Sequence, residues 1–189
     1  MKTSLSDIAT IQTGLFAQTI LKGDTIYLQS KHFDENGHFI QNLEPNLKAD
    51  YITNKHLLKH GDILFSAKGT KNFAAWYESK NTPAVASTSF FVIRLRENFS
   101  DKIFPEFLVW YINNPASQKL LKGKAIGTSI VSISKPVLEE LKVSIPDLET
   151  QKAILQIANL YKEEKKIKQQ IDKLREQQIQ QQIINSINL

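Results

Sequence analysis

Cysteine is absent from the 189 residues of the chain. This absence excludes disulfides, thiolate nucleophiles and thiolate-zinc sites. The sequence also has no run of eighteen apolar residues, and its first stretch, MKTSLSDIATIQTG, lacks the apolar segment and cleavage site of a secretory signal. Nothing in it directs the chain into or across a membrane, so we expect a cytoplasmic protein.

Motifs that cradle nucleotides are missing too, because neither G-x-x-x-x-G-K-[ST] nor G-x-G-x-x-G occurs. No nucleophile has a recognisable partner base, so the sequence predicts no cofactor and favours binding over catalysis. One enzymatic alternative stays open. His56 and His60 lie four residues apart, with Asp62 behind them, and could serve a small metal-dependent nuclease, although two surface histidines beside a turn are the commoner arrangement.

The balance of charge is moderately positive. The formal net charge is +5 and the isoelectric point is near 9.3. This favours a polyanionic partner, but the charge is far below that of a dedicated nucleic-acid arm. Composition therefore permits DNA binding without demonstrating it.

The first 146 residues mix strand and helix patterns without a regular strand-helix-strand period, which predicts an α+β domain with a mixed sheet. Residues 3–13 have apolar positions at helical spacing, and Asn36-Gly37 between the segments TIYLQSKHF and HFIQNL is typical of a β-hairpin. Further along we expect a strand at 63–65, an exposed loop at 68–72, a strand within 84–97, helices across 104–123 with a break at Pro115, a short helix from Lys135 or Pro136, and a closing strand before Pro146.

Residues 147–189 contain neither glycine nor proline and predict one long helix from Leu148 to about Ile187, with Asp147 as a plausible N-cap. Forty helical residues would extend about 60 Å, more than a domain of this size can cover. The apolar stripe therefore needs another chain, although it changes register after Leu174. The expected dimer-interface residues are Leu160, Ile167, Ile171, Leu174, Ile179, Ile183 and Ile187.

Several segments, taken in order, carry a family resemblance. They are GDILFSAKGT, the AVASTSFFVIRL strand, the stretch FLVWYINNPASQKLLKGKAIGTSIVSISKPVLEELKVSIPDLETQKAIL and the terminal helix. Together they resemble one target recognition domain and one spacer helix of a type I restriction-modification specificity subunit. The joint before the helix is similar to the family's usual Pro-x-Leu-x-Glu-Gln, with Asp147 where a second proline is common and Thr150 where an acid is common.

The resemblance implies a non-catalytic partner of a methyltransferase subunit and, where one exists, of a restriction/translocase subunit. S-adenosylmethionine and ATP chemistry would belong to those partners. Family members commonly carry two domain-helix units in tandem, whereas this sequence has one, so we expect a homodimer that reads an inverted-repeat bipartite target in double-stranded DNA. A heterodimer with an asymmetric target, a fragment of a longer subunit, and a protein-protein adaptor that recruits a partner through its coiled coil remain alternatives.

DNA recognition requires Lys or Arg for phosphates and amides, hydroxyls or Arg for base edges. The loops expected to be exposed supply such side chains, although each loop could equally be a simple turn. Gln29 and Lys31, on the expected hairpin strand, are weaker candidates. The predicted DNA-binding residues are Lys68, Thr70, Lys71, Asn72, Ser87, Thr88, Ser89, Lys122, Lys124, Thr128, Ser129, Gln29 and Lys31.

Overall fold

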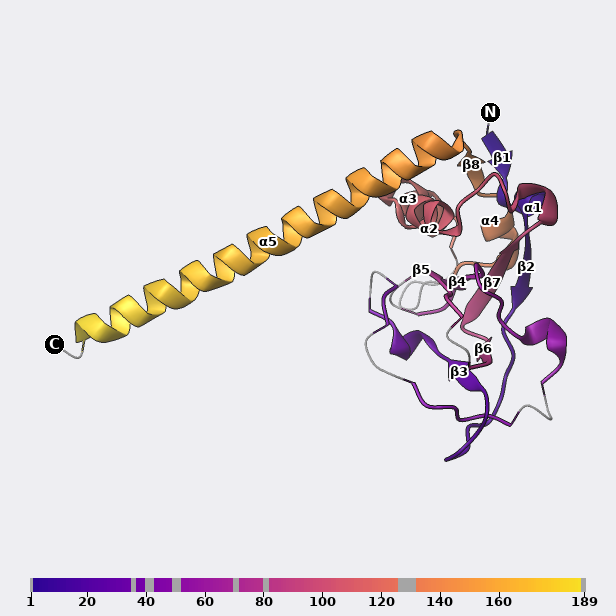
Figure 1. Ribbon diagram of the computed structural model, residues 1–189, viewed down its shortest axis with the longest axis horizontal. Coiled ribbons are helices and arrows are strands. Elements are labelled where there is room, and N and C mark those ends of the chain that lie inside the picture. The colour runs from indigo at the N-terminus through magenta and orange to yellow at the C-terminus, as the bar shows by residue number, and fades with distance from the viewer. Residues whose placement is uncertain are drawn as a thin grey trace. The chain divides into compact units, whose positions relative to one another are not determined.

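The computed structural model describes residues 2–34, 37–39, 43–48, 52–69, 72–79, 82–125 and 132–187 (Figure 1). The chain divides into two units, Met1–Leu148 and Glu149–Leu189. Every sheet formed by the described residues lies in the first unit, and the second is a single helix. Strands and helices are mixed as the sequence predicted, which confirms the α+β class.

The main sheet of the first unit has four antiparallel strands in the order β2-β7-β4-β5. Their bounds are β2 Ala9–Thr13, β4 Ile63–Ser66, β5 Ala74–Trp76 and β7 Phe90–Leu95. Strand β4 is buried along its whole length, in keeping with its continuous apolar run, and Ile63 pairs with Ile93 of β7. The aromatic rings of Phe33, Phe73 and Phe90 pack on one another in the core beside this sheet.

Two smaller sheets complete the unit. Strand β1 (Lys2–Ser4) pairs antiparallel with β8 (Lys142–Ser144), so the two ends of the unit lie side by side. Strand β3 (Ile26–Leu28) pairs in parallel with β6 (Ala84–Ala86). Because a parallel pair needs a long crossover, the 55 residues between Leu28 and Ala84 must leave this sheet and return to it.

The short helices are α1 (Leu5–Ile8), α2 (Pro105–Asn113), α3 (Pro115–Gly123) and α4 (Lys135–Glu139), with 3-10 turns η1 (Ser30–His32), η3 (Asn54–His56) and η4 (Glu97–Phe99). The predicted break at Pro115 is confirmed. There the Asn114 side chain accepts a hydrogen bond from the Ala116 amide at 3.0 Å and caps α3. Asn113, the last residue of α2, exchanges two side-chain hydrogen bonds with the backbone of Ala74 at 2.7 and 2.8 Å, which ties α2 to β5.

The prediction of one helix over residues 3–13 is wrong. Only Leu5–Ile8 is helical, and β1 and β2 flank it. Thr10, Ile11 and Thr13 are β-branched, and residues 9–13 pair along their whole length with β7. Pairing at the edge of the main sheet therefore determines the structure of this segment, despite apolar residues at helical spacing.

The expected hairpin at Asn36-Gly37 is mostly wrong. Strand β3 ends at Leu28 and pairs with β6 rather than with the segment after the turn. An isolated antiparallel bridge between Phe33 and Phe39 is the pairing across this turn among the described residues. Gly37 has a φ of 82°, as a turn glycine requires, whereas Asn36 lies outside the described residues.

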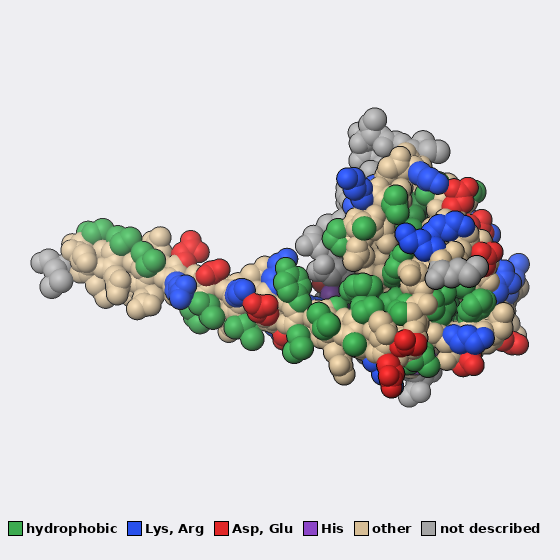
Figure 2. All heavy atoms as spheres, turned by 90° about the horizontal axis from the view of Figure 1, so that it is seen from above, with side chains coloured by type: hydrophobic (Ala, Val, Ile, Leu, Met, Phe, Trp, Pro, Cys, Tyr) green, Lys and Arg blue, Asp and Glu red, His purple; other side chains and the backbone are tan. Residues whose placement is uncertain are grey.

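The second unit is α5, which runs from Leu148 to Ile187 over 40 residues as predicted. At about 100° per residue, Leu160, Ile167, Ile171 and Leu174 lie within an arc of about 60° on the helix surface, whereas Ile179, Ile183 and Ile187 centre about 150° further round. Figure 2 shows hydrophobic side chains on one edge of the middle of this helix and on the other edge near its end. The register shift predicted from the sequence therefore divides the apolar stripe into two parts. We call Leu160, Ile167, Ile171 and Leu174 the proximal arc, and Ile179, Ile183 and Ile187 the distal arc.

No helix in the described ranges combines the length and apolar character that a bilayer span requires.

Candidate nucleic-acid interface

Three segments meet at the turn Ser87–Ser89, which joins β6 to β7. The Leu15 amide donates to Ala86 O at 2.9 Å, the Ser87 amide donates to Leu28 O at 2.8 Å, and the Ala67 amide donates to Ser89 O at 2.9 Å. These backbone bonds bring six of the predicted residues together, because Gln29, Lys31, Lys68 and the three turn residues all lie on segments joined here. We call residues 14–17, 28–31, 67–69 and 87–89 the turn cluster.

Gly14 allows the turn cluster to close. A Cβ at this position would lie 2.1 Å from the carbonyl oxygen of Ser87, closer than any side-chain carbon can approach. The Gly14 amide also donates to Phe90 O at 3.0 Å. Only glycine permits this approach of two backbones, so the end of β2 is held directly against the turn.

The three turn residues divide into an inward and an outward part. Ser87 is buried, and its hydroxyl lies 2.6 Å from that of Ser89. Thr88, at the tip, is exposed. The expectation of an exposed Ser87 is therefore wrong, because its hydroxyl and backbone satisfy other groups of the turn, whereas Thr88 offers a hydroxyl to a ligand.

Lys68 and Asn72 flank a short stretch in which Thr70 and Lys71 lie outside the described residues. Lys68 is exposed and forms an isolated antiparallel bridge with Ser132. Asn72 is buried, and its amide donates to Ser66 O at 3.1 Å. The expectation that Asn72 is exposed is wrong, although no described group hydrogen-bonds to its Oδ1.

Gln29 and Lys31 lie at turn η1 rather than on the predicted hairpin strand. The backbone amide of Gln29 donates to Nδ1 of His32 at 3.2 Å, which fixes the turn, and Lys31 remains exposed. Burial of the His32 ring, with a smaller contribution from the charge of Lys31, lowers the pKa of His32 below its ordinary value. A neutral His32 therefore shapes the backbone that carries both candidates.

Lys122 and Lys124 lie at the end of α3, and both are exposed. Lys124 Nζ lies 2.8 Å from Oε2 of Glu140, and this hydrogen-bonded cation lowers the pKa of Glu140. The pair partly neutralises the charge that Lys124 was expected to offer to a phosphate. Thr128 and Ser129 lie outside the described residues.

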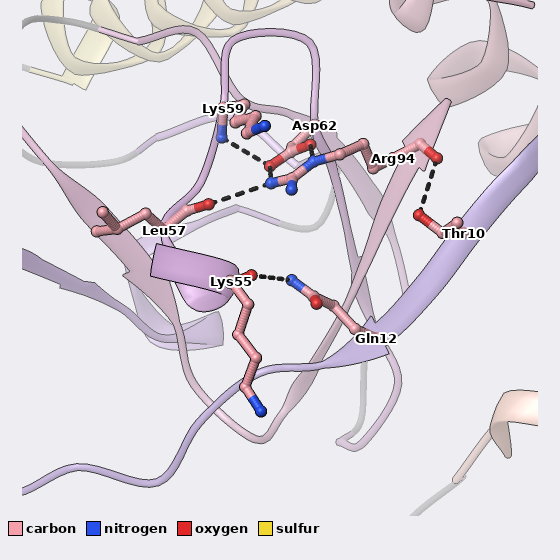
Figure 3. Close-up of polar contacts among 7 residues, drawn as sticks. All are labelled: Thr10, Gln12, Lys55, Leu57, Lys59, Asp62 and Arg94. Carbon is pink, nitrogen blue, oxygen red and sulfur yellow. Dashed lines mark hydrogen bonds and ion pairs between the residues drawn. The ribbon is translucent and has the colours of Figure 1, made fainter. Parts of the chain in front are cut away.

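An ion pair between the half-buried Arg94 and the buried Asp62 supports residues 57–62, and no sequence motif indicates it directly (Figure 3). Arg94 of β7 contacts both oxygens of Asp62, with Nε at 2.7 Å from Oδ1 and Nη2 at 2.6 Å from Oδ2, and it also donates to Leu57 O at 3.1 Å. The bond with Asp62 raises the pKa of Arg94. An Asp directly after a turn glycine and an Arg in an apolar strand were the available signals, although neither identifies the other.

The described residues offer no metal site for the nuclease alternative, because they contain no group of three His, Asp or Glu side chains that could hold an ion. His60 instead packs edge-on against Trp76, with ring centroids 5.6 Å apart. The turn cluster, with exposed cationic and hydroxyl groups and the half-buried side-chain amide of Gln29 on a fixed backbone, is a better candidate site for a polyanion.

Comparisons with solved structures agree with this fold. The S subunit of a type I restriction-modification system from M. genitalium matches with a TM-score of 0.58 at 16% identity, over 86% of this chain and 39% of that chain. The HsdS subunit from Thermoanaerobacter tengcongensis gives 0.61 at 17%, over 88% and 43%. A chain from a study of complex assembly and conformational transition of the type I R-M system gives 0.66 at 16%, over 89% and 44%.

The chain thus spans about two-fifths of the length of these solved subunits. No curated protein matches it. The model of the family described as type I restriction modification DNA specificity domain matches residues 1–186, which is nearly the whole chain. Family match, mixed-sheet unit and long helix agree with one another, and the chain therefore belongs to the type I restriction-modification DNA specificity domain family.

Proposed function

We propose that this chain is a half-subunit that reads one half of a bipartite DNA target and dimerises through α5. The observation that carries the proposal is the apolar surface of α5 in a chain with one sheet-containing unit. Leu160, Ile167 and Leu174 are 70, 55 and 56% exposed. Burying one such side chain fully contributes about 1.5–3 kcal/mol, so a partner helix would gain much from covering the proximal arc.

A second copy of the same chain is the simplest partner. Isologous contacts between two copies bury the same residues on both helices and close the assembly at two subunits. Two recognition units held by such a pair are related by a two-fold axis, and their half-sites form an inverted repeat. Pairing with a different half-subunit would give an asymmetric target instead.

The turn cluster would supply the DNA contacts of each unit. Lys68 and Lys31 suit phosphates, whereas Thr88 and the amide of Gln29 suit base edges. Phosphate contacts would set affinity and its salt dependence, and base contacts would set the sequence that is read. Methyl transfer and ATP-driven steps would belong to separate methyltransferase and restriction subunits, with this chain as the non-catalytic member.

The deciding experiment maps methylated DNA in cells that contain this chain and its methyltransferase subunit. A two-part palindrome supports the homodimer, and a two-part asymmetric motif supports a heterodimer. Loss of all methylation at that motif when the chain is removed is also expected. If methylation stays unchanged without the chain, and the purified chain does not distinguish the motif from a scrambled duplex, the adaptor alternative replaces the proposal.

A further inference from the structure

We propose that Phe16 is a specificity-determining residue that contacts the 5-methyl group of a thymine in the DNA target. The inference rests on the proposed DNA-reading function and adds to it a residue and a chemical group. Phe16 is 78% exposed, an unusual position for a large aromatic side chain. It lies within the turn cluster, directly after Leu15, which bridges in parallel to Ser87.

The backbone on both sides of Phe16 is fixed. The hydroxyl of Tyr27 donates to Leu15 O at 3.0 Å and accepts from the Ala17 amide at 3.4 Å. Tyr27 is itself buried, with 4% exposed. Leu15 is held further by its amide bond to Ala86 O. One buried hydroxyl therefore joins the two neighbours of Phe16, and presenting this ring to a ligand would cost little loop-ordering entropy.

Phe16 and Thr88 both face outward. Leu15 and Ser87, the bridged pair, are both less exposed than the residues that follow them. Phe16 and Thr88 are those next residues, and both are exposed. An exposed apolar ring and an exposed hydroxyl thus each directly follow one member of the bridge.

The chemistry around Phe16 favours a base edge over a protein surface. The other exposed side chains of the turn cluster are the hydroxyl of Thr88 and the cations Lys31 and Lys68, whereas Leu15 packs against a core cluster. In the major groove, a thymine presents a methyl group beside hydrogen-bond acceptors, and phosphates flank it. Apolar, polar and cationic groups together match that pattern, whereas a protein-docking face would be more continuously apolar.

The test uses the full chain with its methyltransferase subunit and a duplex that carries the methylated motif of the parent. Phe16→Ala and Phe16→Leu are compared with Leu21→Ala, a control on the same connection whose side chain is 100% exposed. Each thymine of the motif is replaced in turn by uracil, which removes only the methyl group. All affinities are measured at one salt concentration.

For the parent, one uracil replacement should weaken binding about 4-fold, because burying one methyl-sized group contributes about 0.8 kcal/mol. Phe16→Ala should weaken binding to the thymine duplex about 10-fold and should no longer distinguish it from the uracil duplex. Phe16→Leu should keep part of the discrimination, and Leu21→Ala should bind like the parent. The thermal midpoints of all variants should agree, since both side chains lie in water.

Three results would overturn the inference. The parent could be indifferent to every uracil replacement, Phe16→Ala could discriminate as the parent does, or Phe16→Ala could lose the methyltransferase subunit while binding DNA normally. In each case the proposed function survives if the parent still prefers its motif to a scrambled duplex. Absence of that preference in the parent would instead refute the proposed function itself.

Discussion

Asp62, directly before β4, and Arg94 of the neighbouring strand β7 are joined by two hydrogen bonds of 2.7 and 2.6 Å, with Asp62 only 1% exposed. The same carboxylate accepts the Lys59 amide at 2.7 Å, and the same guanidinium donates to Leu57 O. Figure 3 shows these contacts beside the Gln12 side chain, which donates to Lys55 O at 2.9 Å. One ion pair therefore anchors the backbone of residues 57–62 to β7.

Asp62→Ala should lower the free energy of unfolding by about 2 kcal/mol, because it leaves the half-buried Arg94 guanidinium and the Lys59 backbone amide without their acceptor. Arg94→Lys should keep little of the stabilisation that the ion pair contributes, since an ammonium cannot make the bidentate contact with the carboxylate. Urea denaturation followed by circular dichroism measures both effects. Glu140→Gln is the matched control, because it breaks the solvent-exposed pair with Lys124 and should leave the midpoint almost unchanged. Equal losses from Asp62→Ala and Glu140→Gln would contradict this role of the Asp62–Arg94 pair.

Stability should fall on mild acidification because of His32. The fold holds its pKa below the ordinary value near 6.5, and its Nδ1 must be unprotonated to accept the Gln29 amide. As the pH falls through 6.5, the unfolded chain takes up this proton first, so the stabilisation is complete above that pH and decreases below it. Thermal midpoints measured from pH 7.5 to 5.5 should drop more for the parent than for His32→Asn, whose amide oxygen can accept the same bond. The control His56→Gln should keep the drop in thermal midpoint that the parent shows. If the midpoint of His32→Asn falls as steeply as that of His56→Gln, groups other than His32 cause the effect.

Lys68→Ala should weaken binding to all duplexes and reduce the slope of log affinity against log salt by about one unit, as expected for one lost phosphate contact. Lys124→Ala should change the slope less, because Glu140 already pairs with that ammonium. Lys2→Ala, on β1 of a different sheet, serves as the control. Fluorescence anisotropy at four salt concentrations measures the slopes. A slope for Lys68→Ala equal to those of the parent and Lys2→Ala would remove Lys68 from the interface.

Replacing Ile167 and Ile171 with glutamine should raise the dissociation constant of the dimer at least 100-fold, since two apolar side chains per helix leave the seam while helix propensity is kept. Gln169→Ala with Glu176→Ala, on the opposite side of the helix, should not change it. Sedimentation equilibrium over a range of concentrations gives these constants. A monomeric parent at high concentration, alone and with DNA and the methyltransferase subunit, would refute the homodimer.

The distal arc gives a further comparison within that experiment. Ile179→Gln with Ile183→Gln should weaken the dimer less than the proximal pair, because one partner helix covers one face of α5. An equal loss would instead place both arcs in the seam.

The long helix was predictable because nothing in residues 147–189 interrupts it, and the break at Pro115 because proline and its Asn cap act locally. The failures share a different cause. Residues 9–13 form a strand because they pair with β7, which lies about eighty residues away. Strand β3 pairs with β6 rather than with the segment that follows the turn at Gly37. Periodicity over eleven residues contains no information about such distant partners.

The candidate site divides in the same way. The serine, threonine and lysine residues of the expected loops identified segments of the turn cluster. They did not indicate which of these side chains are buried. Ser87 and Asn72 are buried by contacts with Ser89 and Ser66 that are local in space and ordinary in sequence. Phe16 was overlooked because an isolated aromatic residue predicts a core position, whereas the structure leaves its side chain exposed.

The pairing of β1 with β8 has a consequence for synthesis on the ribosome. Lys2 finds its partner Ser144 only when almost the whole first unit has been translated. Until then the first strand has an open edge, and contacts so distant in sequence form slowly. We expect β1 to stay unpaired on the nascent chain until that last strand emerges from the exit tunnel.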